Sequence, residues 1–400
     1  MSKPFHVYLD LDVFNNSTDF TAKPPQLSFE ETRTQPFLDG TADDYFVAIA
    51  RFSIQTGETL PVFIPAIDTT QSDPTLTVYK VTLMYKGASA SATAIYTPQP
   101  SHDQVSPPNG TNGQDFSGNY YYIYNYQDWI TMVNAALFQA HVLLIAHVRS
   151  QFPSDGFVTA TPLPQPPFLQ IDLTTLTCVL NADAAWYDTN VPIGTASIYF
   201  NTRLHQLFAG LPTFFLGYST DTYAFPGTAV PDVIGDRNFQ IKMNNNNYSN
   251  TLSVNNNGTT QKYIQAFQEI NSVGLWNPVA AIVFTSTTLP IHPTLTSPPK
   301  IYNNNSTGLV GAGTTNLTNI LSDFEIAISN TNQYRPELSY APPGEYRLID
   351  MYSNSNLSKI DLNVYWKDRY GNLKPLRLQP GCSASVKLLF RHKHFYLGVE

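Results

Sequence analysis

Two carboxylates near the start of the chain are the first residues whose spacing could support chemistry. Asp10 and Asp12 lie two positions apart in the segment Phe5 to Phe14, and residues two apart on a β-strand project from the same face. Two carboxylates on one face are the minimum geometry for a calcium site or an acid–base pair. No third ligand is recognisable nearby, and carboxylate pairs are also common on solvated strand faces. Both interpretations, a functional pair and a solvated surface, therefore stay open.

Two histidines share one predicted helix. His141 and His147 are six residues apart, so at about 100° per residue they project about 240° apart, from different faces. The i, i+4 spacing that places two histidines on one zinc ion is missing. We therefore expect histidines of a helix surface or a subunit interface, not a metal site.

Five tyrosines crowd one short segment before that helix. They are Tyr120, Tyr121, Tyr122, Tyr124 and Tyr126. Tyrosine rings provide large contact areas at low entropic cost, which favours subunit interfaces or stacking on sugars. A strand of this kind presents rings on both faces, and we name Tyr120, Tyr122 and Tyr124 as candidate contacts for a receptor or glycan. A strand buried on both faces explains the same pattern.

The motifs of common enzyme and cofactor sites are missing. The chain contains no GxSxG, no Walker loop, no GxGxxG and no CxxC pair, so no residue qualifies by motif as catalytic, cofactor-binding or metal-binding. We therefore predict no enzymatic activity and no cofactor. Cys178 and Cys382 lie in different regions and are expected to be free thiols.

The composition favours a protein whose faces meet other subunits. Only 13% of the 400 residues are charged, about half the ~25% of an ordinary soluble domain. Burying uncharged polar groups in an interface costs less than burying charges. The net charge of −8 provides no long-range attraction to nucleic acid or an anionic membrane. One dense basic segment, which either a solvated last strand or a binding patch explains, contains Lys387, Arg391, His392, Lys393 and His394.

No signal sequence or membrane span is predicted. The N-terminus has no apolar core of a signal peptide. The most apolar stretch, Ala140 to Val148, contains two histidines and is far shorter than the ~18 residues of a membrane helix. We expect a soluble protein made in a reducing compartment of the host cell.

The elements that must position these residues are mostly strands. Alternating apolar residues predict a half-buried strand over Phe5 to Phe14. The other predicted strands cover Tyr45 to Ile54, Leu60 to Pro65, Leu76 to Tyr85, Val279 to Thr285, Phe324 to Ser329, Glu345 to Met351, Lys359 to Trp366, Leu373 to Leu378 and Ser383 to Phe390. This arrangement is typical of a sandwich or barrel.

The middle of the chain differs from its ends. Tyr96 to Gly118 is rich in Pro, Ser, Asn and Gly and predicts a loop or linker. Apolar residues at spacings of three and four predict a long helix from Gln127 to about Arg149, and a shorter helix is predicted over Asn201 to Ala209. A second loop is predicted over Leu289 to Gly313.

Both ends of the chain resemble one viral family. The segments that carry the resemblance are Phe29 to Phe37, Asp43 to Ile54, Leu60 to Pro65, Ile360 to Asn372, Pro375, Leu376, Gly381 and Val386 to Arg391. They are similar to the opening and the close of the penton, or minor capsid, proteins of Polinton-like elements, adintoviruses and virophages, which are icosahedral double-stranded DNA viruses. The two stretches that contain them, from Phe29 to Pro65 and from Ile360 to Arg391, cover slightly less than a fifth of the chain.

The resemblance implies a mainly all-β fold. It implies a single jelly-roll β-sandwich built from residues 1–97 and 279–400, with residues 98–278 as a mixed outer insertion domain that contains the long helix. It also implies five copies closing each vertex of the virion, with the major capsid protein of the same virus as neighbour. Five-fold closure requires a heterologous interface. From residue type alone we place it at Arg33, Gln35, Arg369 and Tyr370.

A carbohydrate- or receptor-binding β-sandwich, lectin-like or a viral attachment module, is the alternative function. It rests on the tyrosine segment and the Asp10/Asp12 pair. The two functions combine if the middle region binds a host receptor or glycan on a capsid.

Overall fold

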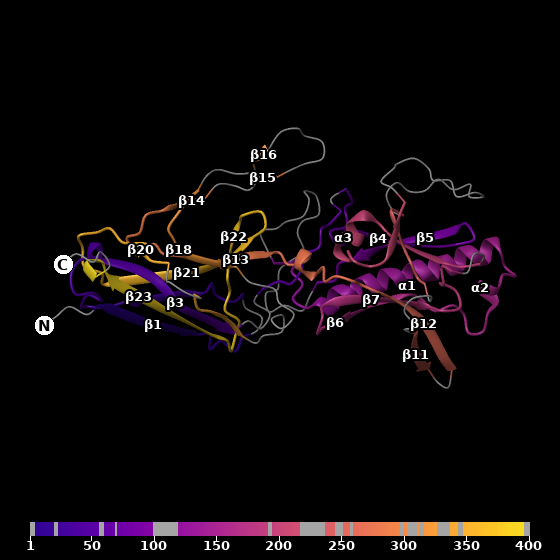
Figure 1. The fold of residues 1–400 in the computed structure, drawn as a ribbon, viewed down its shortest axis with the longest axis horizontal. Helices are drawn as coiled ribbons and strands as arrows, with labels where there is room; N and C mark the ends of the chain where they lie inside the picture. The colour runs from indigo at the N-terminus through magenta and orange to yellow at the C-terminus, as the bar shows by residue number, and fades with distance from the viewer. Residues whose placement is uncertain are drawn as a thin grey trace. The chain divides into compact units, whose positions relative to one another are not determined.

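The computed structural model divides into two compact units. The first comprises Met1–Pro61 and Pro278–Glu400, and the second comprises Val62–Gln99 and Val105–Asn277. Both ends of the chain are thus interleaved in the first unit, as the indigo and yellow strands of Figure 1 show. The residues that the structure describes are 5–19, 23–55, 60–68, 70–98, 119–190, 194–216, 237–244, 251–256, 259–296, 300–301, 310–311, 316–325, 337–342 and 347–395.

Eight strands of the first unit form two antiparallel sheets. In chain order they are β1 (His6–Phe14), β2 (Ser28–Thr32), β3 (Tyr45–Gln55), β13 (Val279–Thr285), β18 (Ile320–Glu325), β19 (Glu337–Tyr340), β21 (Lys359–Asp368) and β23 (Ser383–His392). One sheet has the order β1-β23-β3-β19 and the other β18-β13-β21-β2. The first strand therefore pairs with the last, the second with the seventh, the third with the sixth and the fourth with the fifth. This nested pairing is the jelly roll, and the predicted fold class is confirmed.

The two sheets pack through their apolar faces. On β1, Leu9 and Leu11 are buried whereas Asp10 and Asp12 are exposed, which is the predicted alternation of a half-buried strand. Phe52 on β3 meets Phe284 on β13 edge-to-face, with ring centroids 4.9 Å apart. Aromatic rings in this geometry add to the free energy gained by burial.

A buried carboxylate fixes the loop that follows β13. Asp361 on β21 is 7% exposed and accepts hydrogen bonds from three consecutive residues, Ser286, Thr287 and Thr288. The hydroxyl of Thr288 also accepts from the Asp361 backbone N–H at 2.8 Å. Burial raises the pKa of Asp361, but the hydrogen bonds from Thr288, Thr287 and Ser286 outweigh it and lower that pKa to about 2.

The first unit also contains six short strands outside the eight-strand sandwich. Two-stranded ribbons between β13 and β18 pair β14 (Thr294–Thr296) with β17 (Asn316–Thr318), and β15 (Lys300–Ile301) with β16 (Val310–Gly311). β20 (Ile349–Asp350) pairs with β3, and β22 (Leu373–Pro375) pairs with β21. Single 3-10 turns occupy Ala42–Asp44 and Lys393–Phe395.

The second unit combines two sheets with one long helix. The first sheet, in the order β5-β4-β8-β10-β9, contains β4 (Leu76–Tyr85), β5 (Ala88–Ile95), β8 (Ser197–Phe200), β9 (Thr213–Phe215) and β10 (Phe239–Ile241). The other, in the order β11-β12-β7-β6, contains β6 (Phe168–Asp172), β7 (Thr177–Asp183), β11 (Thr251–Asn256) and β12 (Thr259–Phe267). The helices are α1 (Tyr126–Gln151), α2 (Gly156–Thr159) and α3 (Thr202–Leu207), with a 3-10 turn at Val273–Leu275.

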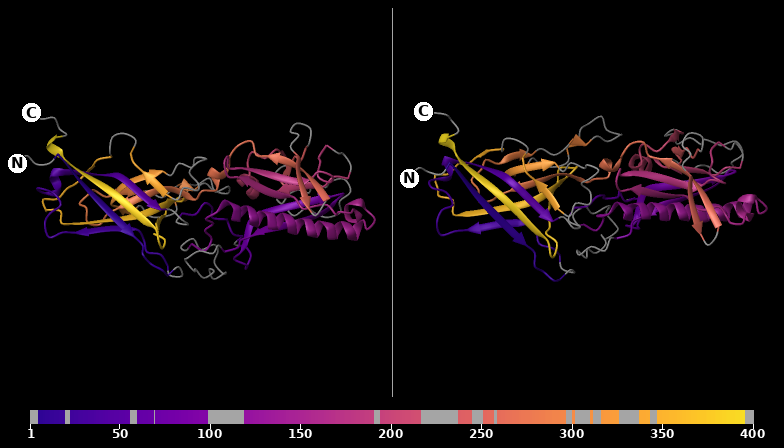
Figure 2. Two further views of the ribbon diagram at one scale, coloured as in Figure 1. Left: turned by 90° about the horizontal axis from the view of Figure 1, so that it is seen from below. Right: turned by 60° about the horizontal axis from the view of Figure 1, so that its bottom comes forward.

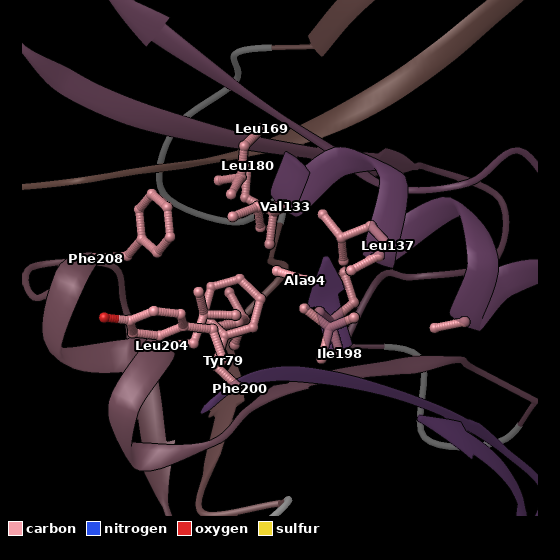
Figure 3. Packing of buried hydrophobic residues seen from close by; sticks show 14 of the residues in the cluster. Tyr79, Ala94, Val133, Leu137, Leu169, Leu180, Ile198, Phe200, Leu204 and Phe208 are labelled. Atoms are coloured by element: carbon pink, nitrogen blue, oxygen red, sulfur yellow. The ribbon is translucent and has the colours of Figure 1, made fainter. Parts of the chain in front are cut away.

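Helix α1 supplies much of the core of this unit. It packs on β5, β4 and β6 and lies along one side of the unit in Figure 2. Its N-cap is Asn125, whose side chain accepts from the Gln127 N–H and so satisfies a backbone donor that has no partner inside the helix. Figure 3 shows Val133 of α1 beside Leu169 and Leu180, which come from the strands β6 and β7.

The boundaries between the two units differ from those predicted from the sequence. The first unit ends at Pro61, not at residue 97, because β4 pairs with β8, and both β4 and its partner β5 pack against α1 in the second unit. The strand predicted over Leu60 to Pro65 is absent from these described residues, where Phe63 forms a single bridge with Ile123. Within the described part of the strand predicted over Glu345 to Met351, the structure has only the short strand β20. The strand predicted over Leu373 to Leu378 is present only as β22, followed by a single bridge at Arg377.

We predict that Gly210→Ala destabilises the second unit by about 2 kcal/mol, because Gly210 has a φ of +98° and left-handed backbone strains L side chains. An added Cβ would also lie 3.0 Å from the Ile270 backbone nitrogen. Urea unfolding of the full chain measures the change. Gly274→Ala is the matched control, since its Cβ would meet nothing within 4 Å. Equal effects of the two substitutions would contradict the prediction.

Candidate assembly surfaces

The Asp10/Asp12 pair lies on the outer face of the jelly roll. The Asp10 carboxylate is 3.2 Å from Lys387 Nζ and 3.7 Å from Arg51 Nη2, and the three residues are in register across β1, β23 and β3. Asp12 instead faces Ser385 and lines an open groove at the strand ends. Asp10 thus forms ion pairs with neighbouring cationic side chains. This arrangement agrees with two carboxylates on a solvated strand face. Across the described residues, no group of three or more His, Cys, Asp or Glu side chains could hold a metal ion.

The basic segment near the C-terminus does not form one patch. Lys387 pairs with Asp10, and Lys393 pairs with Asp350 and with Asp43. His392 is buried and packs edge-to-face on Tyr45. Because neighbouring carboxylates compensate the two lysines, the observed arrangement agrees with the solvated-strand explanation.

His141 and His147 point in different directions, as the helical spacing predicts. His141 is buried, with Nε2 2.9 Å from the Pro164 carbonyl oxygen and Nδ1 3.2 Å from the Tyr187 hydroxyl. Since a carbonyl only accepts, Nε2 carries the proton and Nδ1 accepts from Tyr187. His147 Nδ1 lies 2.8 Å from the Ser89 carbonyl oxygen. The two rings therefore make separate packing contacts.

We predict that His141 makes the second unit less stable in mild acid. Burial lowers the pKa of His141, so its neutral form is favoured in the folded chain, and folding stability falls as the pH drops below the unfolded value of about 6.5. Burial raises the pKa of nearby Asp183, which has the opposite effect at lower pH. Urea midpoints between pH 7.5 and 5.5 should therefore fall less for His141→Gln than for the wild type. A His141→Gln variant whose midpoint falls as steeply as that of the wild type would contradict the assignment.

The tyrosine segment is not a strand. Residues 119–125 form turns and one bridge, and Tyr126 begins α1. Tyr121 is buried against Tyr96 and Tyr120, so part of the cluster belongs to the core. Tyr120, Tyr122 and Tyr124 are half-buried. Their proposed contact with a receptor or glycan stays a prediction.

The candidate interface residues lie at two ends of the sandwich. Arg33 and Gln35 are exposed beyond β2, whose last residue, Thr32, pairs with Lys359 at the start of β21. Arg369 and Tyr370 are exposed in the turn after β21, which connects β21 to its antiparallel partner β22. Ten residues of extended strand separate these ends, or about 30 Å. The two pairs therefore do not form one patch.

The topology defines two flanks. β1 and β2 are the terminal strands of their sheets on one side and lie beside each other. β19 and β18 are the terminal strands on the other side, where Tyr340 stacks on Phe324 with ring centroids 4.2 Å apart. A head-to-tail contact between identical subunits needs two such different flanks.

Helix α1 has the length and composition of a membrane span. Its 26 residues include an 18-residue window of mean hydropathy 1.6, but half of that window is buried inside the protein. The most apolar stretch that the sequence analysis identified, Ala140 to Val148, is shorter than this window. Packing on β4 and β5 accounts for the buried half, as in core helices of globular proteins.

Comparison with known proteins decides among the functions that these surfaces allow. A family model described as Sputnik minor capsid protein V18/19 matches residues 7–392. The chain belongs to this family. Two Sputnik virophage proteins are similar to it: structural protein V19 is 31% identical over 216 residues, 54% of this chain and 88% of V19. Uncharacterized protein V18 is 29% identical over 156 residues, 38% of this chain and 91% of V18.

Two solved structures resemble this member of the V18/19 family over nearly its whole length. A chain of the Sputnik virophage structure, determined by cryo-EM at 3.5 Å, has a TM-score of 0.77 and 26% identity, and the match covers 98% of this chain and 99% of that one. The mavirus penton protein has a TM-score of 0.56 and 15% identity, with 97% and 99% covered; this likeness concerns the fold alone. The family resemblance predicted from the two chain ends is confirmed, and the protein is a structural component of a virion.

Proposed function

We propose that five copies of this chain close into a ring that forms the vertex of an icosahedral capsid, with no catalytic role. The observation that carries the proposal is the nested eight-strand sandwich with two different flanks. Its fold is similar to that of the mavirus penton protein, and its family is one of minor capsid proteins. In this ring, the β1/β2 flank of each subunit meets the β18/β19 flank of the next.

Each unit has its own part in the proposed ring. The jelly roll makes the ring and meets the major capsid protein, and the second unit forms the outer domain. Arg33 and Gln35 lie at the opposite end of β21 from Arg369 and Tyr370, so the two pairs do not share one contact patch. We place each pair in its own contact between neighbouring subunits, one at each end of the sandwich.

Native mass spectrometry of the purified chain tests the ring. We expect a species of five times 44.6 kDa and entry of this species into particles when the major capsid protein of the same virus is added. Arg33→Glu and Tyr370→Asp, tested separately, should each weaken the ring without changing the circular dichroism spectrum. A chain that stays monomeric alone and with the major capsid protein would overturn the proposal.

A further inference from the structure

Strand β1 is the terminal strand of its sheet, and its second edge has no strand partner among the described residues. β1 has nine residues, contains neither proline nor glycine, and keeps one unbroken register with β23. Of the other terminal strands, β2 has five residues, β18 has six and β19 has four. Edge strands that stay unpaired are normally short or interrupted by a proline or a bulge. β1 therefore has the form of a strand that pairs with another one.

The backbone groups of alternate residues of β1 point away from β23. The N–H of His392 donates to the carbonyl of Phe5, and the N–H of Asn15 donates to the carbonyl of Cys382. Since hydrogen bonds in an antiparallel pair join every second residue, the odd-numbered residues of β1 bond to β23. The outward N–H and C=O groups belong to His6, Tyr8, Asp10, Asp12 and Phe14. This edge offers a row of donors and acceptors about 30 Å long.

The opposite edge of the same sheet lies level with β1. There β19 and β20 both pair with β3, one at each end of it. Through β23 and β3, Val13 lies in the same row of the sheet as Leu338 of β19. His6 lies in the same row as Asp350 of β20. The two edges thus span the same stretch of the sheet.

The second sheet of the sandwich lacks this match between its edges. Its terminal strands are β2 and β18, and Ser28 of β2 shares a row with Ile320 of β18. From that row β2 extends toward Lys359 of β21, whereas β18 extends toward Lys367. One shared row supports few hydrogen bonds, so the registers favour the β1 sheet as the one that continues into a neighbour.

We propose that β1 of one subunit adds to the β19/β20 edge of the next copy of this chain, so that one sheet continues between them. The inference rests on the proposed ring. A closed ring has no rise along its axis, so surfaces that touch must lie at one height, as these edges do when the strands run along the axis. All neighbouring strands in the order β1-β23-β3-β19 are antiparallel, so β1 and β19 run in opposite directions. Rotation about such an axis preserves those directions, and the new pair is antiparallel like the rest of the sheet.

This contact uses main-chain groups, and the side chains of β1 keep their places on the two faces of the sheet. Leu9 and Leu11 stay buried in the sandwich, and Asp10 keeps its ion pair with Lys387. Strand addition of this kind gains affinity from backbone hydrogen bonds. A substitution that removes one outward N–H therefore tests the contact without altering the core.

Proline at position 12 distinguishes the backbone edge from the side chain. Asp12→Pro removes an outward N–H and places the proline ring where the neighbouring strand would lie, whereas the pairing with β23 loses no hydrogen bond. We expect the dissociation constant of the ring to rise at least about tenfold, with an unchanged urea midpoint for the dissociated chain. Asp12→Ala, which keeps the N–H, is the matched control and should assemble like the wild type. A ring of wild-type affinity in Asp12→Pro overturns the inference.

Hydrogen exchange of the unaltered chain provides a second measurement. In the ring, the amides of Tyr8, Asp10 and Asp12 should exchange at least about tenfold more slowly than in the dissociated chain. A ring that adds no protection to β1 overturns this inference alone. Protection of β1 that appears only after the major capsid protein is added would assign the edge to that protein and also overturn it. A wild type that never forms a ring overturns the proposed function, and this inference with it.

Discussion

Asp361→Ala is expected to reduce the free energy of unfolding of the jelly roll by about 3 kcal/mol. The carboxylate accepts the side-chain hydroxyls of Ser286, Thr287 and Thr288 at 2.8, 2.8 and 2.7 Å, and the backbone N–H groups of Thr287 and Thr288 at 2.9 and 2.8 Å. Removing the carboxylate leaves these donors without their acceptor in a site that is 7% exposed at Asp361. Hydrogen exchange of β21 and β13, followed by mass spectrometry, measures the loss in the full chain.

The pH dependence of the same substitution distinguishes a charged acceptor from a packing effect. The pKa of Asp361 is lowered to about 2, so the carboxylate adds stability above its unfolded value of about 3.9, and this contribution is lost as the pH falls toward 2. The gap between the wild type and Asp361→Ala should therefore narrow from pH 5 to pH 3. Asp323→Asn, which breaks an exposed ion pair with Arg347, should change stability by less than about 1 kcal/mol. A gap independent of pH would show that the carboxylate charge is not involved.

Trp129→Ala is expected to destabilise the second unit by about 4 kcal/mol. Trp129 is fully buried in α1, and its ring contacts Phe63 at 4.7 Å and Tyr79 at 5.1 Å between centroids. The cavity left by the indole cannot be filled by neighbours from three separate chain segments. Urea unfolding followed by circular dichroism, together with hydrogen exchange of α1, measures the effect.

A conservative variant separates packing from hydrogen bonding at this site. Trp129 Nε1 is a buried donor with no hydrogen-bond partner among the atoms that the structure describes, so Trp129→Phe removes an unsatisfied group as well as part of the ring. We expect it to cost less than half as much as Trp129→Ala. Leu173→Ala, at a site 47% exposed, should change stability by no more than about 0.5 kcal/mol. A Trp129→Ala protein with wild-type stability would exclude a central packing role.

Local periodicity in the sequence predicted the regular elements well. Phe5 to Phe14 became β1 (His6–Phe14), and Gln127 to Arg149 became α1 (Tyr126–Gln151). In both cases a long pattern of one period matched a face that is buried in the structure. The Leu60 to Pro65 segment was equally apolar, but its prolines remove backbone donors, and it forms a single bridge at Phe63.

The sequence did not predict which unit each strand belongs to. Leu76 to Tyr85 was correctly predicted as a strand, β4, yet it belongs with β8 and α1 rather than with the jelly roll. Strand periodicity reports which residues are buried and is silent on the partner strand. The Tyr120 to Tyr126 segment was misassigned for a related reason, since aromatic enrichment raises strand propensity but does not distinguish a strand from a packed turn.

The candidate surfaces were only partly visible in the sequence. The Asp10 and Asp12 spacing predicted their shared face, but the partners of Asp10, Lys387 and Arg51, come from strands far away in the chain. A contact between subunits depends on the surfaces of two molecules, which residue type alone does not describe. Arg33 and Tyr370 were predicted together, but they lie at opposite ends of β21.

The nesting of the strands has a consequence for synthesis. The Asn15 side-chain amide donates to the carbonyl of Leu378, 363 residues later, and β1 pairs with β23, which is synthesised only after the whole second unit. At about 5–20 residues per second, the first strands wait roughly 20–70 s for their partners, while the second unit, contained between Val62 and Asn277, emerges earlier. The nascent N-terminal strands therefore present unpaired edges during this interval, and such edges are prone to pair with other chains.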